Sequence, residues 1–185
     1  MVQGTSLSKT QGASTPEEVE RMRNVPYASA IGSIMYAMVC TRLDVAFALS
    51  VTSRYQSNPG ESHWTAVKNI LKNFRRTKDA FLVYGGKEEL SIVGYTDASF
   101  QTDRDDFKSQ AGYVFCLNGG AVTWKSYNQD TTADSTTEAE YMAAAEAAKE
   151  GTEDNIADPL TKALGKPKHE SHTWSMGIRE MLDWP

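Results

Sequence analysis

The sequence predicts an α+β chain (α/β-like), in which a helical first half precedes an incomplete antiparallel sheet and one packed helix. Apolar residues recur at helical spacing in the first half, and after Gly85-Gly86 they alternate as in strands. Hydrophobic residues make up 40% and charged residues 23% of the 185 residues, a composition typical of globular proteins. We expect four segments, with boundaries at 1–26, 27–84, 87–164 and 165–185.

Residues 1–26 are polar and rich in Ser, Thr, Gln and Gly, which predicts a flexible leader with one helical turn over Pro16–Met22. This segment contains no apolar run of the ~7–15 residues that a secretory signal needs. The most apolar stretch, Ile31–Val51, is interrupted by Arg42 and Asp44, so we expect no membrane span. The predicted location is intracellular, cytoplasmic or nuclear.

Three helices are predicted over residues 27–84. The first places Ile31, Ile34, Met35 and Met38 on one face, and the second, capped by Asp44, does so with Val45, Ala48, Leu49 and Thr52. The third begins near Ser62, and its expected apolar face is Trp64, Val67, Leu71 and Phe74.

The third helix also carries the densest basic stripe of the chain, made of Lys68, Lys72, Arg75, Arg76 and Lys78. One interpretation is a solvated face with core aromatic residues behind it. The other is a surface that follows the phosphates of a bound duplex. The net charge of −5 argues against a globally basic nucleic-acid coating protein, although it leaves such a local stripe possible.

Three short strands are predicted after Gly86, at Leu90–Tyr95, Tyr113–Leu117 and Ala121–Ser126, joined as a meander through the turn Asn118-Gly119-Gly120. A helix follows, with Ser135 and Glu138 as a capping box and Gly151 as its stop. Its many alanines would let it lie close to the sheet. Residues 165–185 read as a polar tail.

Two acids stand out because of where these elements place them. Asp97 ends the first strand and Glu140 lies one turn beyond the cap of the helix that should pack across the sheet, so both carboxylates can converge. Paired carboxylates suit hard divalent cations such as Mg²⁺, and two-metal phosphodiester chemistry needs several of them in one pocket. For any isolated acid, however, solvation at the surface is the usual role. Cys40 and Cys116 predict reduced thiols rather than a disulfide framework, and the pair His169 and His172 lacks further ligands at metal-binding spacing.

Five ordered words carry a resemblance to a known family: YASAIGSIMYA at 27–37, GYTDA at 94–98, GYVF at 112–115, STTEAEY at 135–141 and DNIADPLTK at 154–162. Together they resemble the Pol polyprotein of copia-type retrotransposons, over residues 5 to 182. The resemblance implies that residues 27–84 derive from the end of the reverse transcriptase and its connection, and that residues 90 onward derive from ribonuclease H. Nothing here resembles the paired-aspartate motif of the polymerase.

By the same resemblance, Asp97, Glu140 and Asp158 are the catalytic and metal-binding acids of a ribonuclease H that uses Mg²⁺ or Mn²⁺ against an RNA/DNA hybrid. Glu138 is the helix cap rather than a ligand. The family carries a further strand with another catalytic Asp between the last two acids, whereas here Asp158 follows Glu140 by only 18 positions. A short connection that returns Glu153 or Asp154 to the pocket is the one substitute the sequence offers.

The missing strand and acid predict a truncated, inactive ribonuclease H-like domain with vestigial site residues. They also predict an exposed strand edge through which copies of the chain associate. Two alternatives remain open: a weak RNA/DNA hybrid-binding module that uses the basic stripe, or a repurposed interaction protein such as a secreted RxLR-type pathogen effector. The chain contains no Arg-x-Leu-Arg word.

Overall fold

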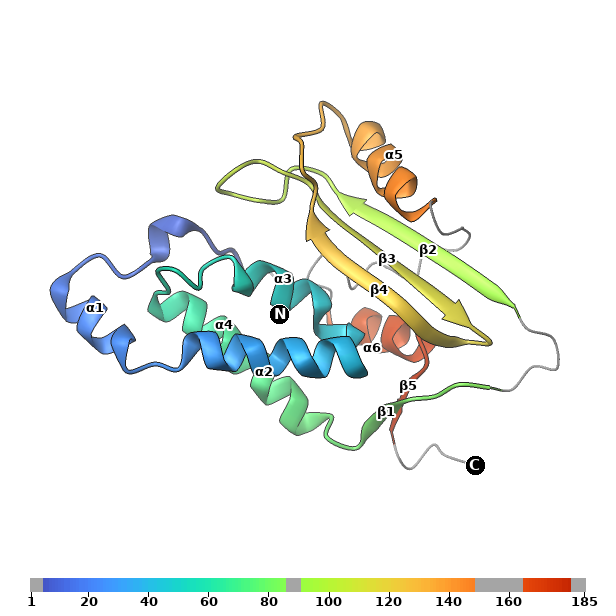
Figure 1. The fold of residues 1–185 in the computed structure, drawn as a ribbon, viewed down its shortest axis with the longest axis horizontal. Coiled ribbons are helices and arrows are strands. Elements are labelled where there is room, and N and C mark those ends of the chain that lie inside the picture. Colours follow the sequence, from blue (N-terminus) through green and yellow to red (C-terminus); the bar gives the residue numbers. More distant parts are fainter. Residues whose placement is uncertain (1–4, 86–90, 149–164, 181–185) are drawn as a thin grey trace.

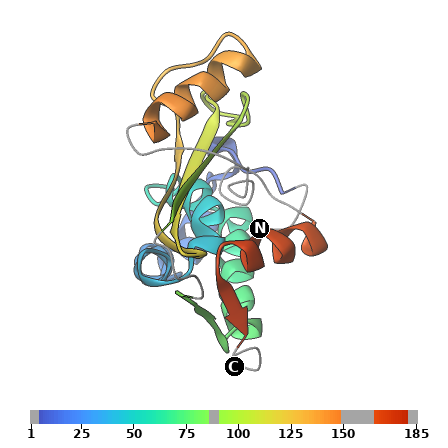
Figure 2. The same cartoon turned by 90° about the vertical axis from the view of Figure 1, so that its right-hand side faces the viewer.

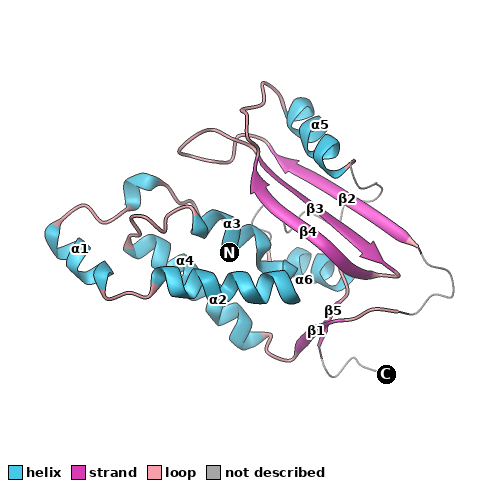
Figure 3. Cartoon of the chain, viewed as in Figure 1, coloured by secondary structure: helices cyan, strands magenta, loops and turns pink. Residues whose placement is uncertain are grey.

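A computed structural model describes residues 5–85, 91–148 and 165–180 of the chain. A layer of helices lies against one face of a three-stranded antiparallel sheet, and a further helix packs on two strands of that sheet (Figures 1 and 3). The predicted α+β class is confirmed. The helices are α1 (Pro16–Arg23), α2 (Tyr27–Cys40), α3 (Ala46–Ser53), α4 (Glu61–Arg76), α5 (Thr136–Ala147) and α6 (Lys166–Ser175), with 3-10 turns η1 (Lys9–Gln11) and η2 (Leu43–Val45). The strands are β1 (Ala80–Leu82), β2 (Ile92–Ser99), β3 (Gln110–Leu117), β4 (Gly120–Asn128) and β5 (Ile178–Glu180).

Helices α2, α3 and α4 share one apolar core. The predicted face of the second helix is buried in full, because it lies between α2 and α4. On α2, Ile31 and Ile34 are buried, whereas Met35 of the predicted face is 44% exposed. The buried members of this core are Tyr27, Ile31, Ile34, Val45, Ala48, Leu49, Val67 and Ile70.

Asp44 does not cap a helix as predicted. Its carboxylate accepts two hydrogen bonds from Arg42, at 2.9 Å from Nε and 2.8 Å from Nη2, and both side chains are buried. Arg42 Nη2 also donates to Thr77 Oγ1 at 2.7 Å. A bidentate pair with a buried guanidinium occupies the acceptor oxygens that a cap would need, so Asp44 ties α2 to the end of α4 instead.

The sheet is an antiparallel meander in the order β2-β3-β4, as the turn signal predicts. Asn118 and Gly119 both have positive φ, 49° and 83°, which is the backbone of the two-residue turn that matches strand twist. Asn118 Oδ1 accepts from the Ser91 amide at 2.9 Å, and this bond fixes the start of β2 against the turn. The strands extend beyond the predicted ranges, to Ser99 and Asn128.

Residues 165–180 form structure where the sequence predicts a polar tail. Helix α6 leads into β5, which pairs antiparallel with β1, with Ala80 opposite Glu180; Figure 2 shows the two strands side by side below the sheet. Met176 and Ile178 are buried in the core between sheet and helices, together with Leu43, Val114 and Cys116. Two apolar residues among polar neighbours carry no periodic pattern, so the sequence does not indicate this packing. In the described part of the chain, no helix has the length and apolar character needed to cross a membrane.

Candidate functional site

Asp97 lies near the end of β2, directly opposite Gly112 of β3, and is 4% exposed. Side chains alternate along a strand, and directly opposed residues share a face. Asp97 therefore projects on the same face as Tyr95 and Val114, which belong to the core beneath the helical layer. The predicted first acid is thus on the inner face of the sheet.

Glu140 is exposed on the second turn of α5. The helix begins where Ser135 Oγ accepts from the Glu138 amide at 3.1 Å, and the Glu138 carboxylate accepts from the Asp134 amide at 2.6 Å. Glu138 therefore serves the helix start, as expected, although its partner is Asp134 rather than the cap residue itself. Ala139, Ala143 and Ala147 are the buried contacts that let α5 lie on β2 and β3.

Helix α5 covers the outer face of the sheet. Lys125 shares a face with Tyr113 and forms a 3.1 Å ion pair with Glu146 of α5. That face is opposite the one on which Asp97 projects. The start of α5 lies beside the end of β2 (Figure 1), so Asp97 and Glu140 belong to neighbouring element ends, one on the inner face of the sheet and one on the helix of the outer face.

Two of the three predicted acids, Asp97 and Glu140, lie within the described residues. There, no group of three or more His, Cys, Asp or Glu side chains lies close enough to hold an ion. Asp158, with the substitutes Glu153 and Asp154, lies outside the described residues. His169 Nε2 is 3.3 Å from the carbonyl oxygen of Asp44, a contact that serves to attach α6 to the helical layer.

The outer edge of β2 is free of bulges. Eight consecutive pairs join β2 to β3 without one, and Ile92 at the start of β2 is 71% exposed. By contrast, β4 contains an irregularity beside Phe115 and Cys116. Each edge strand packs against a helix, β2 against α5 and β4 against α3, so the bulge is the protection that β4 has and β2 lacks.

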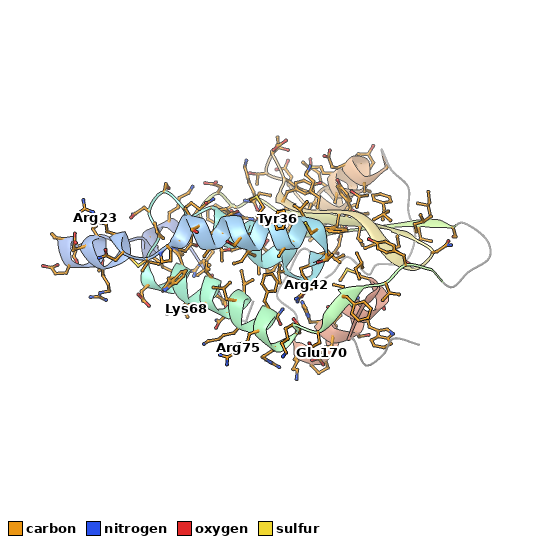
Figure 4. The ribbon with its side chains drawn as sticks, turned by 60° about the horizontal axis from the view of Figure 1, so that its bottom comes forward. Arg23, Tyr36, Arg42, Lys68, Arg75 and Glu170 are labelled. Atoms are coloured by element: carbon orange, nitrogen blue, oxygen red, sulfur yellow. The ribbon has the colours of Figure 1, made fainter. Side chains whose placement is uncertain are left out.

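The basic stripe lies on α4 and just beyond its end. Lys72, Arg75, Arg76 and Lys78 are exposed, and Lys68 pairs with Glu61 at 3.3 Å. Lys68, Lys72 and Arg75 follow the i, i+4, i+7 spacing of one helix face, and Figure 4 shows Lys68 and Arg75 projecting away from α2.

The buried face of α4 differs from the prediction. It consists of His63, Ala66, Val67 and Ile70, while Leu71 is 39% exposed. The shift arises because η1 packs on the first turns of α4, and this contact buries a histidine and an alanine that an apolar pattern does not select.

A polar network between the helices and the sheet was not indicated by any sequence pattern. Asp103, which lies in the loop between β2 and β3, forms a 2.6 Å ion pair with Arg54 after α3. Its carboxylate also accepts from Asn128 Nδ2 at 2.5 Å and from the Asp105 amide at 2.8 Å. Burial alone would raise the pKa of Asp103, but these hydrogen bonds and the charge of Arg54 hold it below its ordinary value. The three aspartates at 103, 105 and 106 are the signal that could have drawn attention to this loop.

Fold and site together define a helical layer joined to a three-stranded sheet with a packed helix, on which two acids lie near one edge. The chain is 51% identical over 144 residues to the retrovirus-related Pol polyprotein from transposon TNT 1-94 of Nicotiana tabacum, covering 78% of this chain and 11% of that protein. It is 31% identical over 150 residues to the Pol polyprotein from transposon RE2 of Arabidopsis thaliana, covering 81% and 10%. The chain therefore belongs to the family of retrovirus-related Pol polyproteins from copia-type transposons, of whose length it spans about a tenth.

A different kind of relative matches over most of its length. Secreted RxLR effector protein 161 of Plasmopara viticola is 46% identical over 129 residues, which cover 70% of this chain and 91% of that protein. No family model and no solved structure matches the chain.

Proposed function

We propose that this chain is a degenerate copia-type Pol segment with a ribonuclease H-like sheet that no longer cleaves RNA/DNA hybrids. Two observations support this proposal most directly. Asp97 projects on the inner face of β2, an edge strand, and Asp158 follows Glu140 by only 18 positions. That spacing leaves no room for the strand and acid that the family carries. A buried Asp97 and an exposed Glu140 on the other side of β2 support the loss of a shared metal pocket.

The chemical reason is electrostatic. A two-metal site places its ions ~3.5–4 Å apart and needs several carboxylates to neutralise and position them. Each Mg²⁺ keeps several waters and takes one or two carboxylates, so a pair of ions needs more acids than Asp97 and Glu140 supply. Loss of one positioning group of this kind typically costs a factor of about 10²–10³ in rate. We therefore expect cleavage, with Mg²⁺ or with Mn²⁺, to be absent or slower by orders of magnitude.

The test is cleavage of a labelled RNA/DNA hybrid by the purified chain beside its Asp97→Asn variant, with each metal. Absence of cleavage by both proteins supports the proposal. Metal-dependent cleavage that the substitution abolishes would overturn it, because Asp97 would then still act as a ligand.

A second candidate is hybrid binding without catalysis, which the exposed stripe on α4 supports. Each phosphate neutralised by a basic side chain contributes about −0.7 to −0.9 to the slope of log affinity against log salt. Arg75→Glu/Arg76→Glu should therefore weaken binding and reduce that slope by about 2. A matched control is Arg21→Glu/Arg23→Glu on α1, which reverses two exposed charges outside the stripe. Unchanged binding by the stripe variant would eliminate this candidate.

A third candidate is a repurposed interaction protein, which the 91% coverage of the RxLR effector relative supports. That relative matches 70% of this chain and is itself named as an effector, so the use of a related sequence outside a polyprotein has a precedent in its name. Recovery of the chain from culture filtrate of its source organism would support secretion. Recovery from inside cells only would count against it.

A further inference from the structure

The N-terminal residues 5–12, here termed the strap, cross from the helical layer to the loop between β2 and β3. Leu7 is 7% exposed in a small cluster with Tyr55 and Ala66. The Lys9 amide donates to the Asp105 carboxylate, at 2.9 Å from each oxygen, and Lys9 Nζ lies 3.3 Å from Asp106. The strap is thus attached to both halves of the molecule.

Its seat on α4 is built around His63, whose residue is 0% exposed. The Gly60 amide donates to His63 Nδ1 at 2.9 Å, and His63 Nε2 lies 3.0 Å from the carbonyl oxygen of Ser8. An amide is a donor and a carbonyl an acceptor, so Nδ1 of His63 is unprotonated and Nε2 carries the proton. The ring stacks on Tyr55 with centroids 4.0 Å apart and planes 2° apart.

Gly60 shows how closely the strap is seated. A Cβ added there would lie 1.8 Å from the carbonyl oxygen of Gln11, a backbone atom that cannot rotate away. The backbone of Gly60 is extended, so alanine would fit its conformation but collide with the strap. The seat therefore needs both a glycine and an unprotonated ring nitrogen, two independent requirements that meet at the same point.

We propose that the strap docks only while the imidazole of His63 is neutral, and that protonation of this ring releases residues 5–12 from the helical layer. A proton on Nδ1 would face the Gly60 amide, donor against donor, inside a buried stack. The same ring also contacts the Ser8 carbonyl of the strap through Nε2. A rotation that moved Nδ1 away from the Gly60 amide would therefore break the contact with Ser8. Release would uncover the Leu7 seat formed by Tyr55, Ala66 and Val51.

The charged groups around the ring act in both directions. Burial lowers the pKa of His63, whereas the Ser8 carbonyl and the carboxylate of Asp105, from the loop packed on the strap, raise it, with burial dominant. Burial, with Asp105 nearby, also raises the pKa of Tyr55 to about 12, so the stacked phenol stays neutral. Because the docked state lowers the pKa of His63, docking is complete above the ordinary value of about 6.5 and is lost as pH falls below it.

The test is an NMR titration of the full chain between about pH 8 and about pH 5. The reporter is the Lys9 amide, whose bond to Asp105 exists only in the docked strap. We expect its signal to move to a released position at acid pH, while the far-UV spectrum of the folded chain persists. His63→Gln keeps a donor for Ser8 but cannot gain a proton, so its strap should stay docked throughout. Gly60→Ala should show the released position already at about pH 8.

Two results would overturn the proposal. One is a wild-type Lys9 signal that does not move over this range. The other is a transition that survives unchanged in His63→Gln, because another group would then be responsible. The matched control is His172→Gln on α6, at a histidine remote from the strap in sequence. This variant should show the same movement of the Lys9 signal with pH as the wild type. If Gly60→Ala fails to fold, the comparison of the two histidine variants still decides.

Discussion

The ion pair between Arg54 and Asp103 should be the polar contact on which the join between helices and sheet depends most. The side chains are 21% and 4% exposed, and the carboxylate also holds Asn128 and its own loop. Arg54→Met leaves this carboxylate buried without its countercharge. Breaking a buried pair in this way typically costs about 3–5 kcal/mol. For a chain of 185 residues, at about 2–4 °C per kcal/mol, the melting temperature should fall by about 6–20 °C.

Urea unfolding at neutral pH measures this loss, with Lys68→Met as the control because the Lys68–Glu61 pair is exposed and should contribute below about 1 kcal/mol. The double variant Arg54→Met/Asp103→Asn should lose less free energy of unfolding than the sum of the single variants, because it no longer buries an unpaired carboxylate. A loss in Arg54→Met no larger than that of the control would refute the reasoning. Since the pKa of Asp103 is depressed in the folded chain, its contribution should also be complete above about pH 3.9 and disappear as pH falls further.

Three further predictions concern separate parts of the molecule. Ser135→Ala removes the cap of α5 and should lower the free energy of unfolding by about 0.5–2 kcal/mol in urea; an unchanged midpoint would show that α5 does not need it. We propose that copies of the chain associate through the edge of β2, so Ile92→Lys should reduce the apparent mass in sedimentation, and a wild type that stays monomeric at all concentrations would contradict this. Burial raises the pKa of Cys116 to about 11, so a thiol reagent should label exposed Cys40 in the native chain and reach Cys116 only after unfolding; equal labelling rates would contradict the buried position.

Local signals in the sequence predicted the elements that local contacts stabilise. The turn at Asn118 and Gly119 and the cap at Ser135 depend on residues within a few positions, and both appear where the sequence indicates. The face of α3 is buried as its apolar spacing predicts. In each case the same residues that carry the pattern make the contact.

Contacts between distant positions could not be read in this way. Strands β1 and β5 have three residues each and pair across the length of the chain, so neither has a periodicity of its own. Asp44 reads as a cap, but in the fold its pair with Arg42 is joined to the end of α4 through Asn73 and Thr77, which lie far along the chain. The prediction that Asp97 and Glu140 converge rests on the end of a strand lying next to the start of a helix. It does not say on which face of β2 Asp97 projects, because that depends on the register of the sheet.

The seat of the strap illustrates the same limit. His63 reads as one polar residue at the start of an amphipathic helix, and its burial follows from the return of residues 5–12 to α4. The residues that hold the strap, Gly60 and Asp105, come from separate loops. Their role becomes visible through distances, not through spacing in the chain.

The most direct test of the central claim is a single-turnover assay of RNA/DNA hybrid cleavage, with the chain in excess over substrate and an intact ribonuclease H as positive control. We predict no cleavage above the no-protein background with Mg²⁺ or Mn²⁺, for the wild type and for Asp97→Asn alike, from protein shown to be folded. Metal-dependent cleavage by the wild type that Asp97→Asn or Glu140→Gln abolishes would contradict the account and show that these acids still form a working centre.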